Sequence, residues 1–174
     1  MRAPIFWVVG HYADEATWSA LHELGLRTTS TEEKQNYYDV LAAARDPALL
    51  AKTLEISLTD ELPTSRAVFL VGKVARYSDH PELAWGFAKA NMKSLLAKTD
   101  ALGANSYVPS LFNFFSEPSR AAELKVYAKT NLPSTAASAM KVAKAVDEVE
   151  FRAEFKRRLI SQLAAWIDKT SKIN

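Results

Sequence analysis

The stretch AVFLVGKVARYSDHPELAWGFAKANMKSLL, from Ala67 to Leu96, decides the fold of this chain. Each half spaces its apolar residues three and four apart, the pattern of an amphipathic helix with one buried face. Between the halves, Asp79 offers an N-cap carboxylate and Pro81 suits the first helical turn, where its missing N–H is not needed. Because the joint is short, the two helices are expected to pack antiparallel.

The same joint recurs along the chain. Asp14, Asp46 and Asp79 each stand before an expected helix, at intervals of 32 and 33 residues. Such a period is typical of stacked helical pairs, none of which can bury its apolar face alone. The sequence therefore predicts an all-α fold. It is expected to be a HEAT- or armadillo-like α-solenoid of stacked antiparallel helix pairs, forming a single domain over residues 1–174.

The remaining segments extend this ladder of helices. Gly25 is expected at the C-terminal end of the helix that Asp14 opens, and residues 99–105 are expected to form a loop. Residues 135–169 predict a long helical region with a break at 156–158, where the apolar face shifts. Its last part should close the solenoid through four apolar side chains, Leu159, Leu163, Trp166 and Ile167.

The first apolar segment, Pro4 to Gly10, has no helix before it to pack against. Alone it would expose Phe6 and Trp7, which an upstream helix would normally cover. We therefore expect the chain to be a C-terminal fragment of a longer protein.

Charge and composition exclude several classes of protein. The 22 basic and 20 acidic residues give a net charge of +2, too balanced to indicate binding to nucleic acid or to an anionic membrane, although the C-terminal part is mildly basic. The lack of cysteine excludes disulfides. It suits a reducing compartment, and we favour the cytoplasm, but many secreted proteins also lack cysteine. No early apolar run is long enough for a membrane span.

Catalytic and metal-binding motifs are missing. His22-Glu23 begins like the zinc motif H-E-x-x-H, but Leu26 occupies the position of the second histidine. His11 and His80 have no partner nearby in the sequence, so all three histidines are expected to be surface or cap residues. We expect no catalytic residue and no metal ligand or other cofactor in this chain.

One polar stripe could bind a ligand. Arg66, Lys73 and Arg76 stand at i, i+7 and i+10 of an expected helix, with Phe69 between them. A row of cations beside an aromatic ring could hold a peptide carboxylate or acidic side chains. The alternative is an ordinary solvated helix face, and that alternative also explains the basic cluster at residues 156–158.

Several runs carry a family likeness: DEATW from Asp14, STEEK from Ser30, AAARDPALL from Ala42, AVFLVGKVAR from Ala67 and PELAWGF from Pro81. Together they resemble the C-terminal helical domain of M1-family zinc aminopeptidases of the puromycin-sensitive and endoplasmic-reticulum type. The likeness continues through residues 113–116 and through Phe155 and Trp166. It departs at residues 63–66, where the family commonly has an Arg-Ser-Gln-Asp-like run.

The resemblance implies a function without catalysis. In that family the zinc site and the G-x-M-E-N exopeptidase motif lie in upstream domains, so this chain would not cleave peptides alone. The family's C-terminal domain is a helical bowl that closes over the catalytic domain, its partner, and lends groups to the far end of the peptide substrate. Arg76, nine residues before Trp85, falls where such enzymes can carry a cavity-facing arginine.

A second hypothesis belongs to a different class. The chain could be a free-standing helical-repeat scaffold that binds a protein or an acidic peptide through Arg66, Lys73 and Arg76. Binding of nucleic acid by the basic C-terminal part is a third reading, which we rank last because the excess charge there is small.

Overall fold

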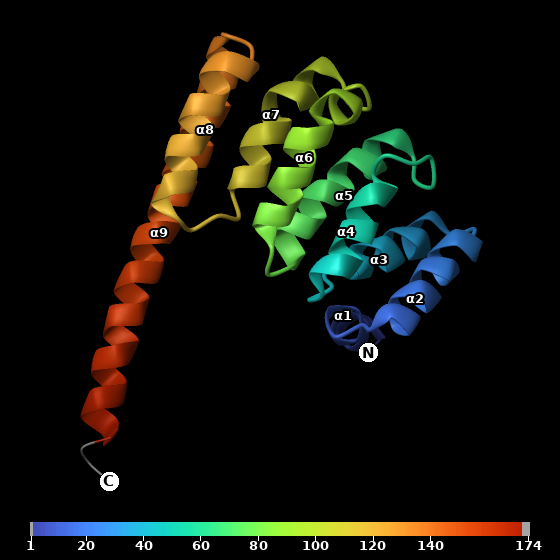
Figure 1. Ribbon diagram of the computed structural model, residues 1–174, viewed down its shortest axis with the longest axis horizontal. Helices are drawn as coiled ribbons and strands as arrows, with labels where there is room; N and C mark the ends of the chain where they lie inside the picture. Colours follow the sequence, from blue (N-terminus) through green and yellow to red (C-terminus); the bar gives the residue numbers. More distant parts are fainter. Residues whose placement is uncertain (1, 172–174) are drawn as a thin grey trace. The chain divides into compact units, whose positions relative to one another are not determined.

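The computed structural model describes residues 2–171, with side chains for residues 5–100 and 103–170. This part of the chain forms nine helices and no strand (Figure 1). They are α1 (Arg2–His11), α2 (Glu15–Arg27), α3 (Thr31–Leu41), α4 (Pro47–Ile56), α5 (Thr64–Tyr77), α6 (Pro81–Leu96), α7 (Ala101–Phe112), α8 (Pro118–Asn131) and α9 (Ala136–Ser171). The predicted all-α fold of packed helix pairs is confirmed.

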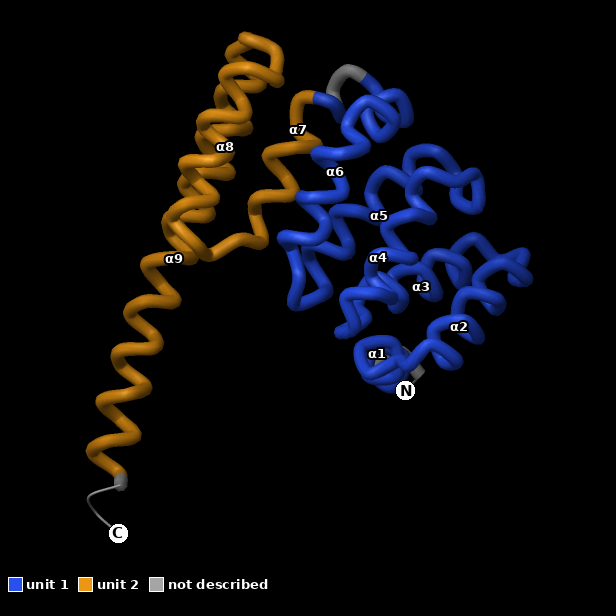
Figure 2. The backbone as a smooth tube through the Cα atoms, in the orientation of Figure 1, with its two compact units in different colours: residues 1–104 blue, residues 105–174 orange. Residues whose placement is uncertain are grey.

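The chain divides into two compact units, residues 1–104 and 105–174 (Figure 2). In the first unit, α3 packs against α1 and α5, α4 packs against α6, and consecutive helices pack as pairs such as α2 with α3 and α5 with α6. In the second unit, α8 and α9 form an antiparallel hairpin. A single domain over residues 1–174 and a HEAT-like solenoid remain predictions.

Two of the three recurring aspartates begin helices as expected. The carboxylates of Asp14 and Asp46 accept backbone N–H groups of the first turns of α2 and α4, at 2.8 and 2.7 Å. The prediction for Asp79 is wrong, because His80 is the N-cap of α6 and makes no side-chain cap bond. Instead, the Ser78 hydroxyl accepts the His80 N–H at 3.1 Å and turns the chain before the helix.

Two glycines allow close packing on α3. Gly25 does not end α2, as predicted, but lies buried inside it, where a Cβ would approach Cε2 of Tyr38 to 2.9 Å. At Gly10 in α1, a Cβ would come within 2.7 Å of the Val40 carbonyl oxygen. Both positions therefore need glycine because α3 leaves no room for a side chain.

The predicted loop over residues 99–105 is also wrong, since α7 begins at residue 101. The Asp100 carboxylate accepts the Gly103 N–H at 2.6 Å, a capping bond that satisfies a free donor in the first turn. A single glycine in this first turn does not prevent the helix.

The predicted break in the last helix is absent, because α9 is one helix of 36 residues. Residues 136–171 contain neither glycine nor proline, and a shift of the apolar face does not interrupt backbone hydrogen bonds. The four apolar side chains expected to close the solenoid are instead exposed by 41 to 63 %: Leu159, Leu163, Trp166 and Ile167.

The aromatic side chains of the first helix pack against rings of α3 and α5. Phe6 packs 5.2 Å from the Tyr37 ring, and Trp7 packs 4.7 Å from the Tyr77 ring. Residues of α3 and α5 therefore half-bury both rings, which an upstream helix was expected to cover. Among the side chains of α1 that the structure describes, Ile5, Val8 and Val9 are exposed apolar residues.

Candidate functional site

The end of α5 places a cation over an aromatic ring. The guanidinium of Arg76 lies 5.3 Å from the centroid of the Tyr77 ring, within the range of a cation–π interaction. The same ring meets Trp7 of α1 edge-on. Arg76 is exposed, so its charge is accessible to a ligand.

The Tyr77 ring that Arg76 contacts also lines a small hollow. It has a volume of about 260 Å³ and is lined by Trp7, Val8, His11, Tyr12, Ala43 and Tyr77. Its wall is fixed because Nδ1 of His11 lies 3.0 Å from the Ala43 carbonyl oxygen, which joins α1 to the chain after α3. A hollow of this composition can accept one apolar side chain, and Tyr77 belongs both to its lining and to the Arg76 contact.

The other two predicted cations are paired within the first unit. Arg66 donates from Nη1 to Oε1 of Gln35 at 2.8 Å, and Lys73 forms an ion pair with Asp39. Gln35 in turn donates to the Asp39 carboxylate at 2.6 Å. These bonds join α5 to α3, so the row of three cations does not act as one open surface.

Phe69 lies apart from Arg76 on the exposed side of α5. Its side chain is 58 % exposed and lines a separate hollow of about 450 Å³ between the start of α5 and the turn before α7. Lys98, in the same lining, donates to the Thr59 carbonyl at 2.7 Å. Ligand binding by Phe69, Arg66, Lys73 and Arg76 stays a prediction.

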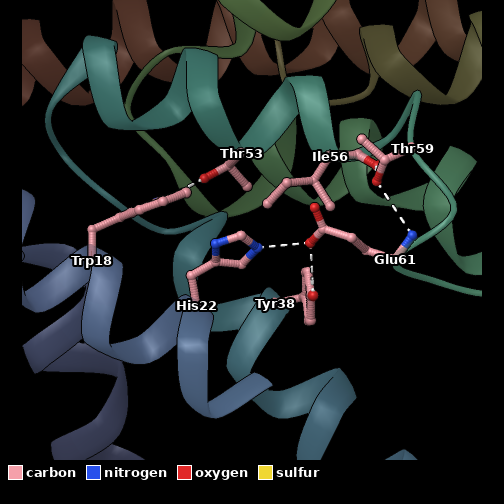
Figure 3. Close-up of polar contacts among 7 residues, drawn as sticks. All are labelled: Trp18, His22, Tyr38, Thr53, Ile56, Thr59 and Glu61. Atoms are coloured by element: carbon pink, nitrogen blue, oxygen red, sulfur yellow. Dashed lines mark hydrogen bonds and ion pairs between the residues drawn. The ribbon is translucent and has the colours of Figure 1, made fainter. Parts of the chain in front are cut away.

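A polar network lies at the junction of α2, α3 and the loop after α4 (Figure 3). Nε2 of His22 lies 2.7 Å from Oε2 of Glu61, and the Tyr38 hydroxyl donates to the same oxygen at 3.0 Å. Burial, and then the bond to Glu61, raise the pKa of the Tyr38 hydroxyl above its ordinary value. His22 is therefore a half-buried packing residue, and its interpretation as a surface or cap histidine is wrong.

Chemistry on this network is not supported by its geometry. A nucleophile must be accessible, but the Tyr38 ring is fully buried and its hydroxyl is bound. Among the described residues, no group of three or more histidine, aspartate or glutamate side chains could hold a metal ion. No helix among these residues is long and apolar enough to span a bilayer.

Comparison with known proteins identifies the class to which this fold belongs. The family model of the ERAP1-like C-terminal domain matches residues 1–151. The chain therefore belongs to this family, and the predicted resemblance to the C-terminal helical domain of M1-family aminopeptidases is confirmed.

Similar curated proteins include the thyrotropin-releasing hormone-degrading ectoenzymes of Rattus norvegicus, Mus musculus and Homo sapiens. Each is 28 % identical to this chain over 159 residues, which is 90 % of this chain. The chain spans only 15 % of the length of these relatives.

The sequence did not predict the hollow lined by Tyr77 or the Glu61 network. The hollow joins Trp7 to Tyr77, seventy residues further on, and Glu61 meets His22 across 39 residues. Helical periodicity indicates which face is apolar but not which distant side chain meets it. The sequence held one local signal for this region: Arg76 directly precedes the aromatic residue Tyr77 at the end of an amphipathic helix.

Proposed function

We propose that this chain is a non-catalytic C-terminal domain of an M1 zinc aminopeptidase, which helps to enclose the active-site chamber and to position or select peptide substrates. Its membership of the ERAP1-like C-terminal domain family and its match to part of the hormone-degrading ectoenzymes support this proposal. The zinc and the peptide-cleaving groups would belong to the upstream catalytic domain of the parent protein. That catalytic domain would be the main partner of this chain.

The observation that carries the proposal is the exposed Arg76 over the Tyr77 ring, which also lines an apolar hollow. A guanidinium binds a carboxylate through charge-assisted hydrogen bonds, and a hollow lined by Trp7 and Tyr12 accepts an apolar side chain. The far end of a bound peptide presents both groups together. We therefore assign the peptide's carboxylate to Arg76 and its neighbouring apolar side chain to the hollow.

The scaffold hypothesis receives less support. It requires Arg66, Lys73 and Arg76 to act together on an acidic partner, but the first two bind Gln35 and Asp39. Releasing them would break the bonds between α3 and α5. Only Arg76 of this row is exposed.

The first test concerns catalysis. The purified 174-residue chain should not cleave aminoacyl arylamides with or without added zinc, and joining it to the parent's upstream zinc domain should be required for cleavage. Zinc-dependent activity in the isolated chain would refute the proposal.

The second test concerns the peptide site. In the full-length enzyme, Arg76→Ala should raise KM for long peptides about tenfold, which corresponds to loss of roughly 1.4 kcal/mol, and should leave KM for single-residue arylamides unchanged. Amidation of the peptide's C-terminus should remove the difference between the variant and the wild type. Lys141→Ala, an exposed lysine on α9, is the matched control. Equal effects on both substrates would show that Arg76 does not bind the distal peptide.

A further inference from the structure

The helical hairpin of the second unit carries a groove beside its turn. The groove has a volume of about 730 Å³ and lies between α8 and the first half of α9, which pack side by side (Figure 1). All of its lining residues belong to the second unit. On α9 the lining runs from Ala136 to Glu150, which is about 21 Å of helix. The groove is therefore long, and it shares no residue with the peptide site proposed at Arg76.

Small side chains open this groove. Further along the hairpin, the seam between α8 and α9 is filled by Leu124 and Val149, which are fully buried. Along the groove, α9 presents three exposed alanines instead, Ala136, Ala139 and Ala143. Their methyl groups are too short to fill the space, so the backbone of a further element can approach α9 closely. The floor of the groove is thus both apolar and accessible.

A buried serine in the lining has an unused hydroxyl. Ser138 is only 2 % exposed, and its N–H donates to Oγ1 of Thr135 at 3.2 Å. Its own hydroxyl forms no hydrogen bond with any described residue. Within the described part of the chain, the Tyr107 hydroxyl is the only buried side-chain oxygen or nitrogen that is both unbonded and inaccessible. The Ser138 hydroxyl is therefore accessible from the groove, where it can bond a polar group of a ligand.

The two rims of the groove carry opposite charges. At one end, Lys125 of α8 and Glu150 of α9 form an ion pair at 3.0 Å. One helical turn nearer the hairpin turn, Lys129 and Asp147 occupy the corresponding places on the two helices. Both are exposed, and neither forms an ion pair with a described residue. The α8 rim therefore offers a cation, and the α9 rim an anion, to a ligand that lies between them.

A helix fits this groove better than an extended chain or a small molecule. An extended peptide adds to the edge of a sheet, and residues 2–171 contain no strand. Small-molecule sites enclose most of the ligand's surface, whereas the alanine floor is exposed along its length. An amphipathic helix binds in an apolar groove and presents charged edges to its rims, which is the combination that α8 and α9 supply.

We propose that the groove of the α8–α9 hairpin binds an amphipathic helix of another polypeptide. The apolar stripe of that helix lies on the alanines, a carboxylate on one edge pairs with Lys129, and a cation on the other edge pairs with Asp147. A small hydroxyl or amide side chain within the stripe bonds Ser138. The charged rims also fix the direction of the partner helix, because reversing it would place like charges together. This interaction surface does not depend on the function proposed above.

A synthetic helix tests the groove. The probe is an end-blocked peptide of about 18 residues with alanine, leucine and one serine on its apolar face, glutamate along one edge and lysine along the other. The fluorescence anisotropy of the labelled probe should show binding to the 174-residue chain with a Kd below about 100 µM. The absence of binding would overturn the proposal.

The place of binding is tested with two arginine substitutions on α9. Ala139→Arg fills the groove and should weaken binding of the probe at least about tenfold. Ala137→Arg, at an exposed position outside the lining, is the matched control and should bind the probe as the wild type does. Both variants should keep the helix content of the wild type by circular dichroism, because arginine is a good helix former. An equal loss of binding in the two variants would show that the groove is not the site.

The charges of the rims are tested with two further probes, one with glutamate and one with lysine on both edges. The wild type should bind the mixed probe about three- to tenfold more tightly than either of these. Lys129→Glu makes both rims acidic and should reverse this order in favour of the lysine probe. Equal binding of all three probes by the wild type would contradict the proposal. If the wild-type chain associates with itself and Ala139→Arg alone prevents this, the groove holds a second copy and the proposed partner is wrong.

The role of the buried hydroxyl is tested with a probe in which alanine replaces the serine. Ser138→Ala should weaken binding of the serine probe about threefold and leave binding of the alanine probe unchanged. A loss that is the same for both probes would show that the partner helix does not bond Ser138.

Discussion

The imidazole Nε2 of His22 lies 2.7 Å from Oε2 of Glu61, the oxygen that also accepts the Tyr38 hydroxyl. A single carboxylate from the loop after α4 therefore joins α2 and α3 (Figure 3). The loop itself is held on its other side, where Lys98 donates to the Thr59 carbonyl. This loop is a structural junction of the first unit.

Removing the carboxylate should destabilise the fold. Glu61→Ala leaves the Tyr38 hydroxyl buried without its acceptor, which costs about 1–3 kcal/mol in free energy of unfolding. Urea unfolding followed by far-ultraviolet ellipticity measures this loss. Glu55→Ala, an exposed glutamate on α4, should change stability by less than about 0.5 kcal/mol. Equal stability of the two variants would show that the network contributes nothing.

Two glycines inside helices should respond in opposite directions to alanine. Gly25→Ala places a Cβ 2.9 Å from the buried Tyr38 ring, and this overpacking should cost about 1–3 kcal/mol. Gly86→Ala in α6 meets no atom within 4 Å and should stabilise by about 0.5–1 kcal/mol through helix propensity. Thermal unfolding of both variants checks the signs. A stabilised Gly25→Ala variant would mean that α2 and α3 do not approach as closely as described.

Local patterns predicted much of the first unit. The caps at Asp14 and Asp46 and the buried stripe through Leu70 and Val74 of α5 are sequence-local features, and the structure has them. The predicted cap at Asp79 is wrong, because the N-cap of α6 is His80. The Ser78 hydroxyl accepts the His80 N–H and holds the turn before the helix. Capping residues can thus be recognised by residue type, but which of several neighbouring residues forms the cap depends on local hydrogen bonds.

Long-range pairings could not be predicted from the same patterns. Lys73 meets Asp39 across 34 residues, and the sequence indicated only that Lys73 lies on a polar face. The apolar face of α9 predicted burial of Leu163, but burial requires a partner, and α8 is too short to supply one. Amphipathicity identifies a face that can be buried and does not identify what covers it.

The ion pair before α8 should make stability depend on acidity. Burial raises the pKa of Glu117, but hydrogen bonds from Lys156 and Ser116 outweigh this, so its pKa lies below the ordinary 4.5. The stabilisation is therefore complete above pH 4.5 and is lost as the pH falls through the folded-state pKa. Because the pair is half-exposed, its contribution should be about 0.5 kcal/mol at most.

Urea unfolding of Glu117→Gln and wild type at pH 6 and at pH 3 checks this dependence. The wild type should be the more stable at pH 6, and the difference should be smaller at pH 3, below the unfolded-state pKa, where folding no longer gains the full stabilisation of the charged carboxylate. A difference that is the same at both pH values would indicate that the carboxylate charge is not involved.

The Lys73–Asp39 pair should be structural and not part of peptide binding. Lys73→Met leaves the Asp39 carboxylate, whose side chain is only 18 % exposed, without its cation, and should cost about 1–2 kcal/mol in unfolding free energy. Arg76→Met, at an exposed position on the same helix, should cost less than about 0.5 kcal/mol. Adding Asp39→Leu to Lys73→Met should recover part of the loss, because the unpaired charge is then removed. If Lys73→Met instead leaves stability unchanged and raises KM for long peptides as Arg76→Ala does, Lys73 belongs to the peptide site, and the assignment of the carboxylate to Arg76 alone is wrong.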